Sequence, residues 1–177
     1  SEVEEIKERL KRLVEEVERR NRKVIRESEE TVKENEKENR KSKKRLKEIL
    51  DEIVERIKDG RSEVVEELER IIRELARRSE KSLRDVERIS RKLVKESRDS
   101  LRELKRRIEE LLEILDRGDK DLKDVKRDVE RVLKENKEVL DRLRKEDEEV
   151  SRRDKKSNED INRVVEDVKR KLEEKAK

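Results

Sequence analysis

The chain has 177 residues, of which 61% are charged and 28% hydrophobic, and its 56 basic and 52 acidic side chains leave a net charge of only +4. It contains no Cys, His, Pro, Met, Phe, Tyr or Trp. The missing His and Cys exclude neutral-pH acid–base switching, thiol nucleophiles, disulfides and thiolate metal sites. The missing aromatics exclude stacking platforms for bases. Glu, Lys, Arg, Leu, Val and Ile dominate, a composition typical of long helices and coiled coils.

The first predicted helix covers residues 2–59. Ser1 and Glu4 form the pattern of a capping box at its start. Gly60, in KDGRSE, marks its end, because glycine readily adopts the positive φ required just after a helix. An apolar stripe at helical spacing runs along this segment, but no apolar side chain occurs between Val32 and Leu46. The stretch ENEKENRKS, residues 34–42, lies in this gap and raises the question of what replaces the stripe.

Two further helices are predicted at residues 62–117 and 120–176. Ser62 is the expected cap of the second helix, Gly118 in DRGDKD marks its end, and Asp119 or Asp121 is expected to cap the third. The third helix has an apolar gap of its own at residues 151–160. Loops this short, around Gly60 and Gly118, require antiparallel neighbours. The sequence therefore predicts an all-α fold: a single up-down-up three-helix bundle over residues 1–177, with helices of about 56 residues.

The apolar stripes of the three predicted helices agree on one register. Adding 119 to the residue numbers of the first stripe carries it onto the third, so that Leu10 matches Val129. Residues of the first and second helices are expected to be level where their numbers sum to about 118. An internal period of 18 residues corresponds to 3.6 residues per turn and favours nearly straight helices with little supercoiling.

Polar residues interrupt all three stripes at matching levels. In this register Ser28 lies level with Ser90 and Asp147, and Asn39 lies level with Ser79 and Asn158. The full candidate set is Asn21, Ser28, Asn35, Asn39, Ser42, Ser79, Ser82, Ser90, Ser97, Asn136, Asp147, Asp154, Ser157 and Asn158. A buried polar group without a partner costs about 1–3 kcal/mol, so such residues are expected to occur together.

Three interpretations of this polar middle remain open from the sequence: structural layers of buried hydrogen bonds, a loosened and hydrated region, and a ligand-binding chamber. The structural interpretation is favoured, because a buried polar residue can fix register and oligomeric state in coiled coils. Asp147 and Asp154 are then expected to accept hydrogen bonds from Ser or Asn side chains, or to be reached by a neighbouring Arg or Lys.

Other candidate activities find little support in the residues. A carboxylate di-metal bundle requires Glu-x-x-His, and the chain has no His. The basic clusters RKSKKR (residues 40–45) and RRDKK (residues 152–156) are short and face acidic neighbours, so nucleic-acid binding is not expected. Without Trp or Phe anchors the amphipathic stripes are expected to pack against other helices and not on a membrane surface. No catalytic residue, cofactor or metal is therefore predicted.

The near-equal helices, the short DGRS and RGDK loops and the charge-filled surfaces resemble those of computationally designed helical bundles with buried hydrogen-bond networks. The resemblance implies a structural scaffold with no natural biochemical function and no natural location, expected to be soluble in recombinant cytoplasmic expression and to need no partner. The alternative is an interaction module, one chain of a designed assembly that self-associates or takes a helical partner. Apolar residues beside the main stripe would then serve a second interface: Val14, Ile25, Val32, Leu50 and Val54.

Overall fold

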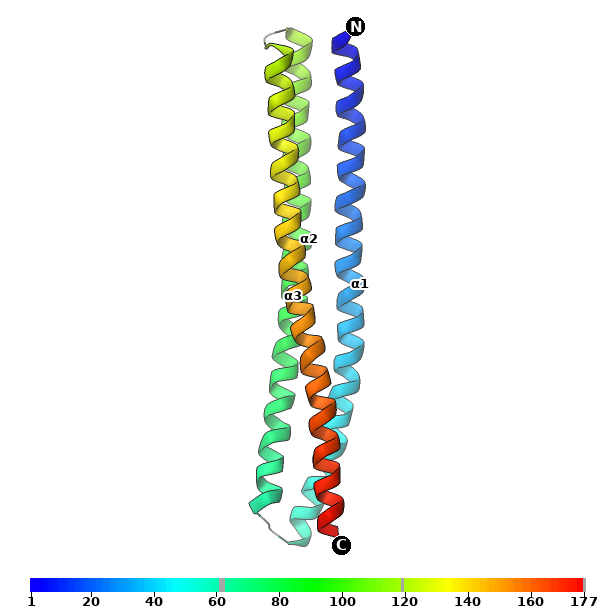
Figure 1. The fold of residues 1–177 in the computed structure, drawn as a ribbon, viewed down its shortest axis with the longest axis vertical. Helices are drawn as coiled ribbons and strands as arrows, with labels where there is room; N and C mark the ends of the chain where they lie inside the picture. Colours follow the sequence, from blue (N-terminus) through cyan, green and yellow to red (C-terminus); the bar gives the residue numbers. More distant parts are fainter. Residues whose placement is uncertain (61–62, 119, 177) are drawn as a thin grey trace. The chain divides into compact units, whose positions relative to one another are not determined.

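The structure is a computed structural model that describes residues 1–60, 63–118 and 120–176. It contains three helices, α1 (Glu2–Asp59), α2 (Glu63–Arg117) and α3 (Leu122–Ala176), and these residues include no strand (Figure 1). The helices pack against one another, which confirms the predicted all-α three-helix bundle. The third helix begins two residues later than predicted, at Leu122 in place of residue 120.

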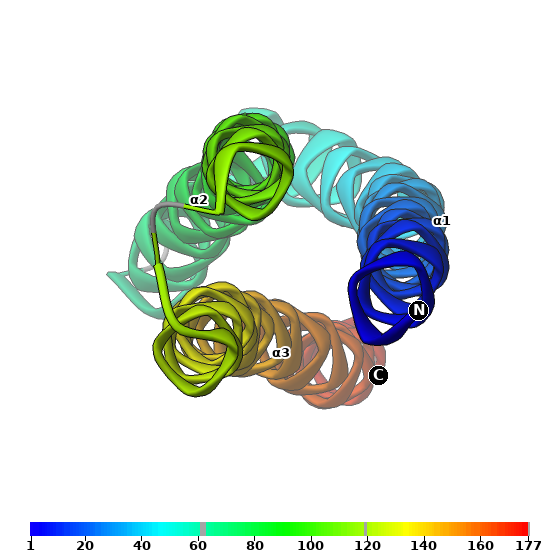
Figure 2. The same ribbon diagram turned by 90° about the horizontal axis from the view of Figure 1, so that it is seen from above.

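The chain is divided into two compact units. Unit 1 comprises Ser1–Glu29 and Ser90–Asp147, and unit 2 comprises Glu30–Ile89 and Glu148–Lys177. Each helix contributes one segment to each unit, so that each unit contains three helical segments. Figure 2 shows, for unit 1, the beginning of α1 (blue), the end of α2 (green) and the beginning of α3 (yellow-green) around a common centre. The single domain and the straight course of the helices stay predictions.

The helix ends follow the capping signals in the sequence. The hydroxyl of Ser1 accepts a hydrogen bond from the backbone N–H of Glu4 at 3.4 Å. Asp121 caps α3, because its carboxylate accepts the N–H of Lys123 and its carbonyl accepts the N–H of Val125. Gly118 follows α2 with a φ of 68°, in the left-handed region that favours glycine. The other two expected caps, at positions 62 and 119, lie outside the described residues.

Hydrogen bonds between the helices confirm the predicted register within each unit. In unit 1 the bonded pairs Asn21–Ser97 and Ser28–Ser90 each have residue numbers that sum to 118, and in unit 2 the pair Asn39–Ser79 does the same. The first and second helices are therefore antiparallel. Bonds from Ser28 to Asp147 in unit 1 and from Asn35 to Asp154 in unit 2 join residues 119 apart, so α1 and α3 are parallel.

Each unit has its own apolar core. The core of unit 1 is built from Leu10, Val17, Leu104, Ile108, Leu111, Leu115, Val125, Val129 and Val132, with a second cluster of Val24, Leu93, Leu140 and Leu143. The core of unit 2 is built from Leu46, Ile49, Ile53, Val65, Leu68, Ile72, Ile161, Val165, Val168 and Leu172. Burying one such side chain stabilises the fold by about 1.5–3 kcal/mol, so these clusters supply most of the driving force. The polar residues of interest continue the same buried faces.

Candidate functional site

The most buried charged group of the described residues is the carboxyl group of Asp154, on α3 in unit 2, whose residue exposure is 0%. Its Oδ2 accepts hydrogen bonds from Nδ2 of Asn35 at 2.8 Å and from Nδ2 of Asn39 at 2.6 Å, both on α1. Its Oδ1 accepts from the hydroxyl of Ser82 on α2 at 2.8 Å. One carboxyl group thus joins all three helices. No Lys or Arg among the described residues forms an ion pair with it, so its partners are neutral donors.

In the two asparagines bound to Asp154, both the amide nitrogen and the amide oxygen form hydrogen bonds. The hydroxyl of Ser79 donates to Oδ1 of Asn39 at 2.9 Å, and Nδ2 of Asn39 also donates to the Asn35 carbonyl at 2.8 Å. Oδ1 of Asn35 accepts from the hydroxyl of Ser151 at 3.2 Å, while its Nδ2 reaches the Ser151 carbonyl at 3.3 Å. We call Asn35, Asn39, Ser79, Ser82, Ser151 and Asp154 the Asp154 network. Because its amides are satisfied at both ends, their orientations are determined by their partners.

One turn from Asn39 and Asp154, a separate pair links α1 and α3. The hydroxyl of Ser42 donates to Oδ1 of Asn158 at 2.8 Å, and both residues are buried. Nδ2 of Asn158 makes no hydrogen bond within the part of the chain that the structure describes. The sequence placed Asn158 level with Asn39, but Asn158 accepts its hydrogen bond from Ser42, three residues further along α1.

A smaller network lies in unit 1. The hydroxyls of Ser28 and Ser90 are 2.7 Å apart, and the hydroxyl of Ser28 donates to Oδ1 of Asp147 at 3.1 Å. The hydroxyl of Ser28 has a single proton, and it donates this proton in its hydrogen bond to the carboxyl group of Asp147. The hydroxyl of Ser90 must therefore donate to Ser28, which defines a chain of donors from α2 through α1 to α3.

A second polar level in unit 1 contains two asparagines. Nδ2 of Asn21 donates to the backbone carbonyl of Ser97 at 2.9 Å, and Nδ2 of Asn136 donates to the hydroxyl of Ser100 at 2.8 Å. Asn21, Ser97 and Asn136 are all buried. This level is less completely paired than the Asp154 network, because some of its polar atoms have no partner in the described residues.

Helical spacing explains why these residues share one face. On α3, Asp147, Ser151, Asp154 and Asn158 follow one another at intervals of four, three and four residues. Residues three and four apart lie on the same side of a helix, so this run continues the stripe that Leu140 and Leu143 begin. The polar groups therefore replace apolar side chains at core positions and do not form a surface patch.

The structure places the predicted residues as follows. Those that are buried are Asn21, Ser28, Asn35, Asn39, Ser42, Ser79, Ser90, Ser97, Asn136, Asp154 and Asn158. Ser82, Asp147 and Ser157 are half-buried. Sequence reasoning left Ser151 out of the set, although its spacing from Asp147 and Asp154 places it on the same stripe. Ser100, whose hydroxyl accepts a hydrogen bond from Asn136, was not in the set either.

The outer surfaces of the helices carry ion pairs. In unit 1, Lys105 on α2 pairs with Glu18 on α1, and this hydrogen bond lowers the pKa of the Glu18 carboxyl. Lys7 pairs with Asp116 across the same two helices, and the hydrogen bond raises the pKa of the Lys7 ammonium. Exposed pairs of this kind are screened by solvent, so they support the bundle without determining its fold.

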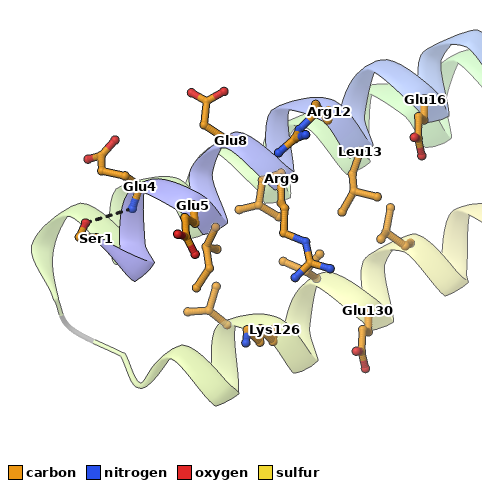
Figure 3. Close-up of a pocket in the computed structure, with 15 residues that line it drawn as sticks. Ser1, Glu4, Glu5, Glu8, Arg9, Arg12, Leu13, Glu16, Lys126 and Glu130 are labelled. Carbon is orange, nitrogen blue, oxygen red and sulfur yellow. Dashed lines mark hydrogen bonds between the residues drawn. The ribbon is translucent and has the colours of Figure 1, made fainter.

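A groove lies between α1 and α3 near the beginning of the chain, in unit 1. Its volume is about 860 Å³, and its lining includes Leu10, Leu13, Val129 and Leu133. Figure 3 shows Arg9 extending from α1 across this groove toward α3, where Lys126 and Glu130 lie. The floor is apolar and the rim is charged, so the groove suits an amphipathic surface better than a small polar substrate.

Within the described residues there is no group of three or more acidic side chains placed to hold a metal ion. None of the described helical segments is apolar over a length that would cross a membrane. Fold and site together define a three-helix bundle with buried hydrogen-bond networks. No protein-family model, curated protein or solved structure matches the chain.

Proposed function

We propose that the chain is a de novo designed structural scaffold without enzymatic activity, in which buried hydrogen-bond networks hold the helices in one axial register. The observation that carries this proposal is the Asp154 network, where one buried carboxyl group accepts donors from both other helices. An apolar seam alone discriminates weakly between registers, because one Leu or Val can replace another. A polar network discriminates strongly, because a slip leaves buried amides unpaired.

The cost of a slip can be estimated from the contacts. Asn35 and Asn39 lie one turn apart on α1, so moving α3 by one turn in either direction would leave Asp154 within reach of only one of the two amides. The other buried donor would lose its acceptor, which costs about 1–3 kcal/mol. A typical domain has a stability of only about 5–15 kcal/mol, so a penalty of this size disfavours the slipped register.

The regularity of the chain supports a designed origin. The three helices contain 58, 55 and 55 residues and are joined by short loops. Acidic residues lie in the first turn of each helix, which complements the helix dipole. Equal elements, deliberate capping and surfaces filled with strong helix formers are the practice of protein design.

The second candidate function is an interaction module, and the groove between α1 and α3 favours it. Its apolar floor, with Leu13 and Leu133, is the kind of surface that an amphipathic helix from another chain would cover. In unit 2, Val64 and Ile71 on α2 are also exposed, at 44% and 40%. An association through these surfaces would add a function to the scaffold without changing its networks.

Sedimentation equilibrium of the purified chain separates the two candidates. The scaffold proposal predicts a mass of 21.6 kDa at every concentration from micromolar to near-millimolar. A mass that rises to twice this value with concentration would favour a self-associating module, and Leu13→Lys should then restore the monomer, because it places a charge in the groove. Val64→Lys tests the exposed surface of unit 2 in the same way, and the variant that restores the monomer identifies the interface. A partner of different sequence would be detected by titration with candidate amphipathic helices.

A further inference from the structure

Apart from Oε2 of Glu96, which forms an ion pair with Arg142, three buried polar atoms in unit 1 have no hydrogen-bond partner in the described residues, one from each helix. They are Oδ1 of Asn21 on α1, Oγ of Ser97 on α2 and Oδ1 of Asn136 on α3. The residues that carry them are 1%, 0% and 2% exposed. An unpaired buried polar atom is costly, and three such atoms on residues within about one helical turn can share a common partner.

The existing bonds place these atoms near one another. Nδ2 of Asn21 is bonded to the carbonyl of Ser97, and Nδ2 of Asn136 is bonded to Ser100. Ser97 and Ser100 are three residues apart on α2, which is about 4.5 Å along the helix axis. Both asparagines are thus anchored through their nitrogens to adjacent turns of one helix, and their oxygens are left as acceptors.

We propose that one water molecule is bound at this level as a structural ligand. The water accepts a hydrogen bond from the hydroxyl of Ser97. It donates one hydrogen bond to Oδ1 of Asn21 and one to Oδ1 of Asn136. The set of one donor and two acceptors matches the hydrogen-bonding capacity of a water molecule, and buried waters typically make about three hydrogen bonds. The three oxygens carry no charge, and hard cations such as Ca²⁺ prefer six or more oxygen ligands.

The structure also provides an access route for this water. A groove of about 380 Å³ between α2 and α3 has both Ser100 and Asn136 in its lining. Glu96, in the same lining, lies 3.6 Å from the guanidinium of Arg142, so its carboxylate has a cationic partner. The groove therefore lies beside Asn136, and we expect the bound water to exchange with solvent from this side.

NMR of the full-length ¹⁵N-labelled chain tests the proposal directly. The sequence has six Asn and no Gln, so the side-chain amide region contains only six NH₂ groups. The NH₂ groups of Asn21 and Asn136 are expected to show cross-peaks to water with opposite signs in NOE and ROE spectra, the signature of a long-lived water. Asn35, whose Nδ2 and Oδ1 are both paired within the protein, is the internal control and is expected to show none.

Substitutions provide a second, independent measurement. Ser97→Ala should weaken the water cross-peaks at both Asn21 and Asn136. The effects of Asn21→Leu and Asn136→Leu on the unfolding constant should not be independent, although no direct bond joins the two residues. The effect of the double substitution should differ from the product of the two single effects by about fivefold or more. Absence of the cross-peaks in the unsubstituted chain overturns the proposal. Independent effects of the two Leu substitutions, within about twofold, also overturn it.

Discussion

Replacement of Asp154 by Leu is expected to lower the free energy of unfolding by about 2–4 kcal/mol, because it removes the acceptor of two buried amide N–H groups. Asn35 and Asn39 would each lose one bond, of 2.8 Å and 2.6 Å, in a place that the chain shields from water. The hydroxyl of Ser82 loses its partner as well, but Ser82 is half-buried and can turn toward solvent. For a chain of this length the change corresponds to a decrease of roughly 4–16 °C in the midpoint of thermal unfolding.

Two control variants separate the role of the hydrogen bonds from other effects. Asp141→Leu, the same substitution at an exposed position of α3, should change the stability by less than about 0.5 kcal/mol. Asp154→Asn keeps the shape of the side chain: its carbonyl oxygen can accept from both asparagines, and the hydroxyl of Ser82 can reverse and accept from its NH₂ group. We therefore expect a smaller loss than for Leu. Equal midpoints for Asp154→Leu and Asp141→Leu would show that the carboxyl group does not hold the network.

Truncation of Ile72 to Ala is expected to be equally damaging, at about 2–5 kcal/mol, because Ile72 is 1% exposed in the core of unit 2. The lost methyl groups leave a cavity in the apolar cluster that also contains Leu46, Ile49 and Val165. The chain supplies an adjacent control, because Ile71 carries the same side chain one position earlier and is 40% exposed.

Denaturant unfolding of the two variants makes the comparison quantitative. Ile71→Ala should lower the free energy of unfolding by less than about 1 kcal/mol, because the partly exposed Ile71 side chain buries less apolar surface than Ile72. A difference of at least about 1 kcal/mol between the variants is expected, with little change in the denaturant m-value. Similar losses at the two positions would mean that α2 does not present Ile72 to the core of unit 2.

The helices and their register could be predicted because each depends on a local or periodic signal. Gly60 and Gly118 separate three stripes of similar length, and the first stripe matches the third at an offset of 119 residues. The hydrogen bonds from Ser28 to Asp147 and from Asn35 to Asp154 reproduce that offset of 119 residues. The start of the third helix was wrong by two residues, because Asp121 acts as the cap while an earlier start at residue 120 is also compatible with the pattern.

Some bonds of the networks could not be predicted, because they depend on side-chain rotamers and not only on helix spacing. Asn39 bonds to Ser79 at its own level, but its amide nitrogen reaches one turn back to Asp154 and not to Asn158. Level in the register therefore identifies some partners, such as Ser90 for Ser28, and not others. Ser151 was missed because the register places it opposite Val32, an apolar residue, and not opposite a polar one.

The central claim is that the Asp154 network, and not the loops alone, determines the axial register of α1 and α3 in unit 2. The most direct measurement is the distance between spin labels on the two helices. The chain has no Cys, so Glu55→Cys and Lys155→Cys, both exposed, introduce the only two attachment sites. In the predicted register, these positions are separated by about 28 Å along the axis, and a slip of one turn changes this by about 5 Å.

Double electron–electron resonance should give a single narrow distance for the labelled chain. In a variant that also carries Asn35→Leu, Asn39→Leu and Asp154→Leu, the helices should still form, because the buried amides and the carboxyl group are replaced together. The hydroxyls of Ser79, Ser82 and Ser151 can then bond to backbone carbonyls of their own helices. The distance distribution of that variant is expected to broaden or to gain a second population displaced by up to about 5 Å. An unchanged, single narrow distance would contradict the claim, because loops and apolar packing would then be sufficient to set the register.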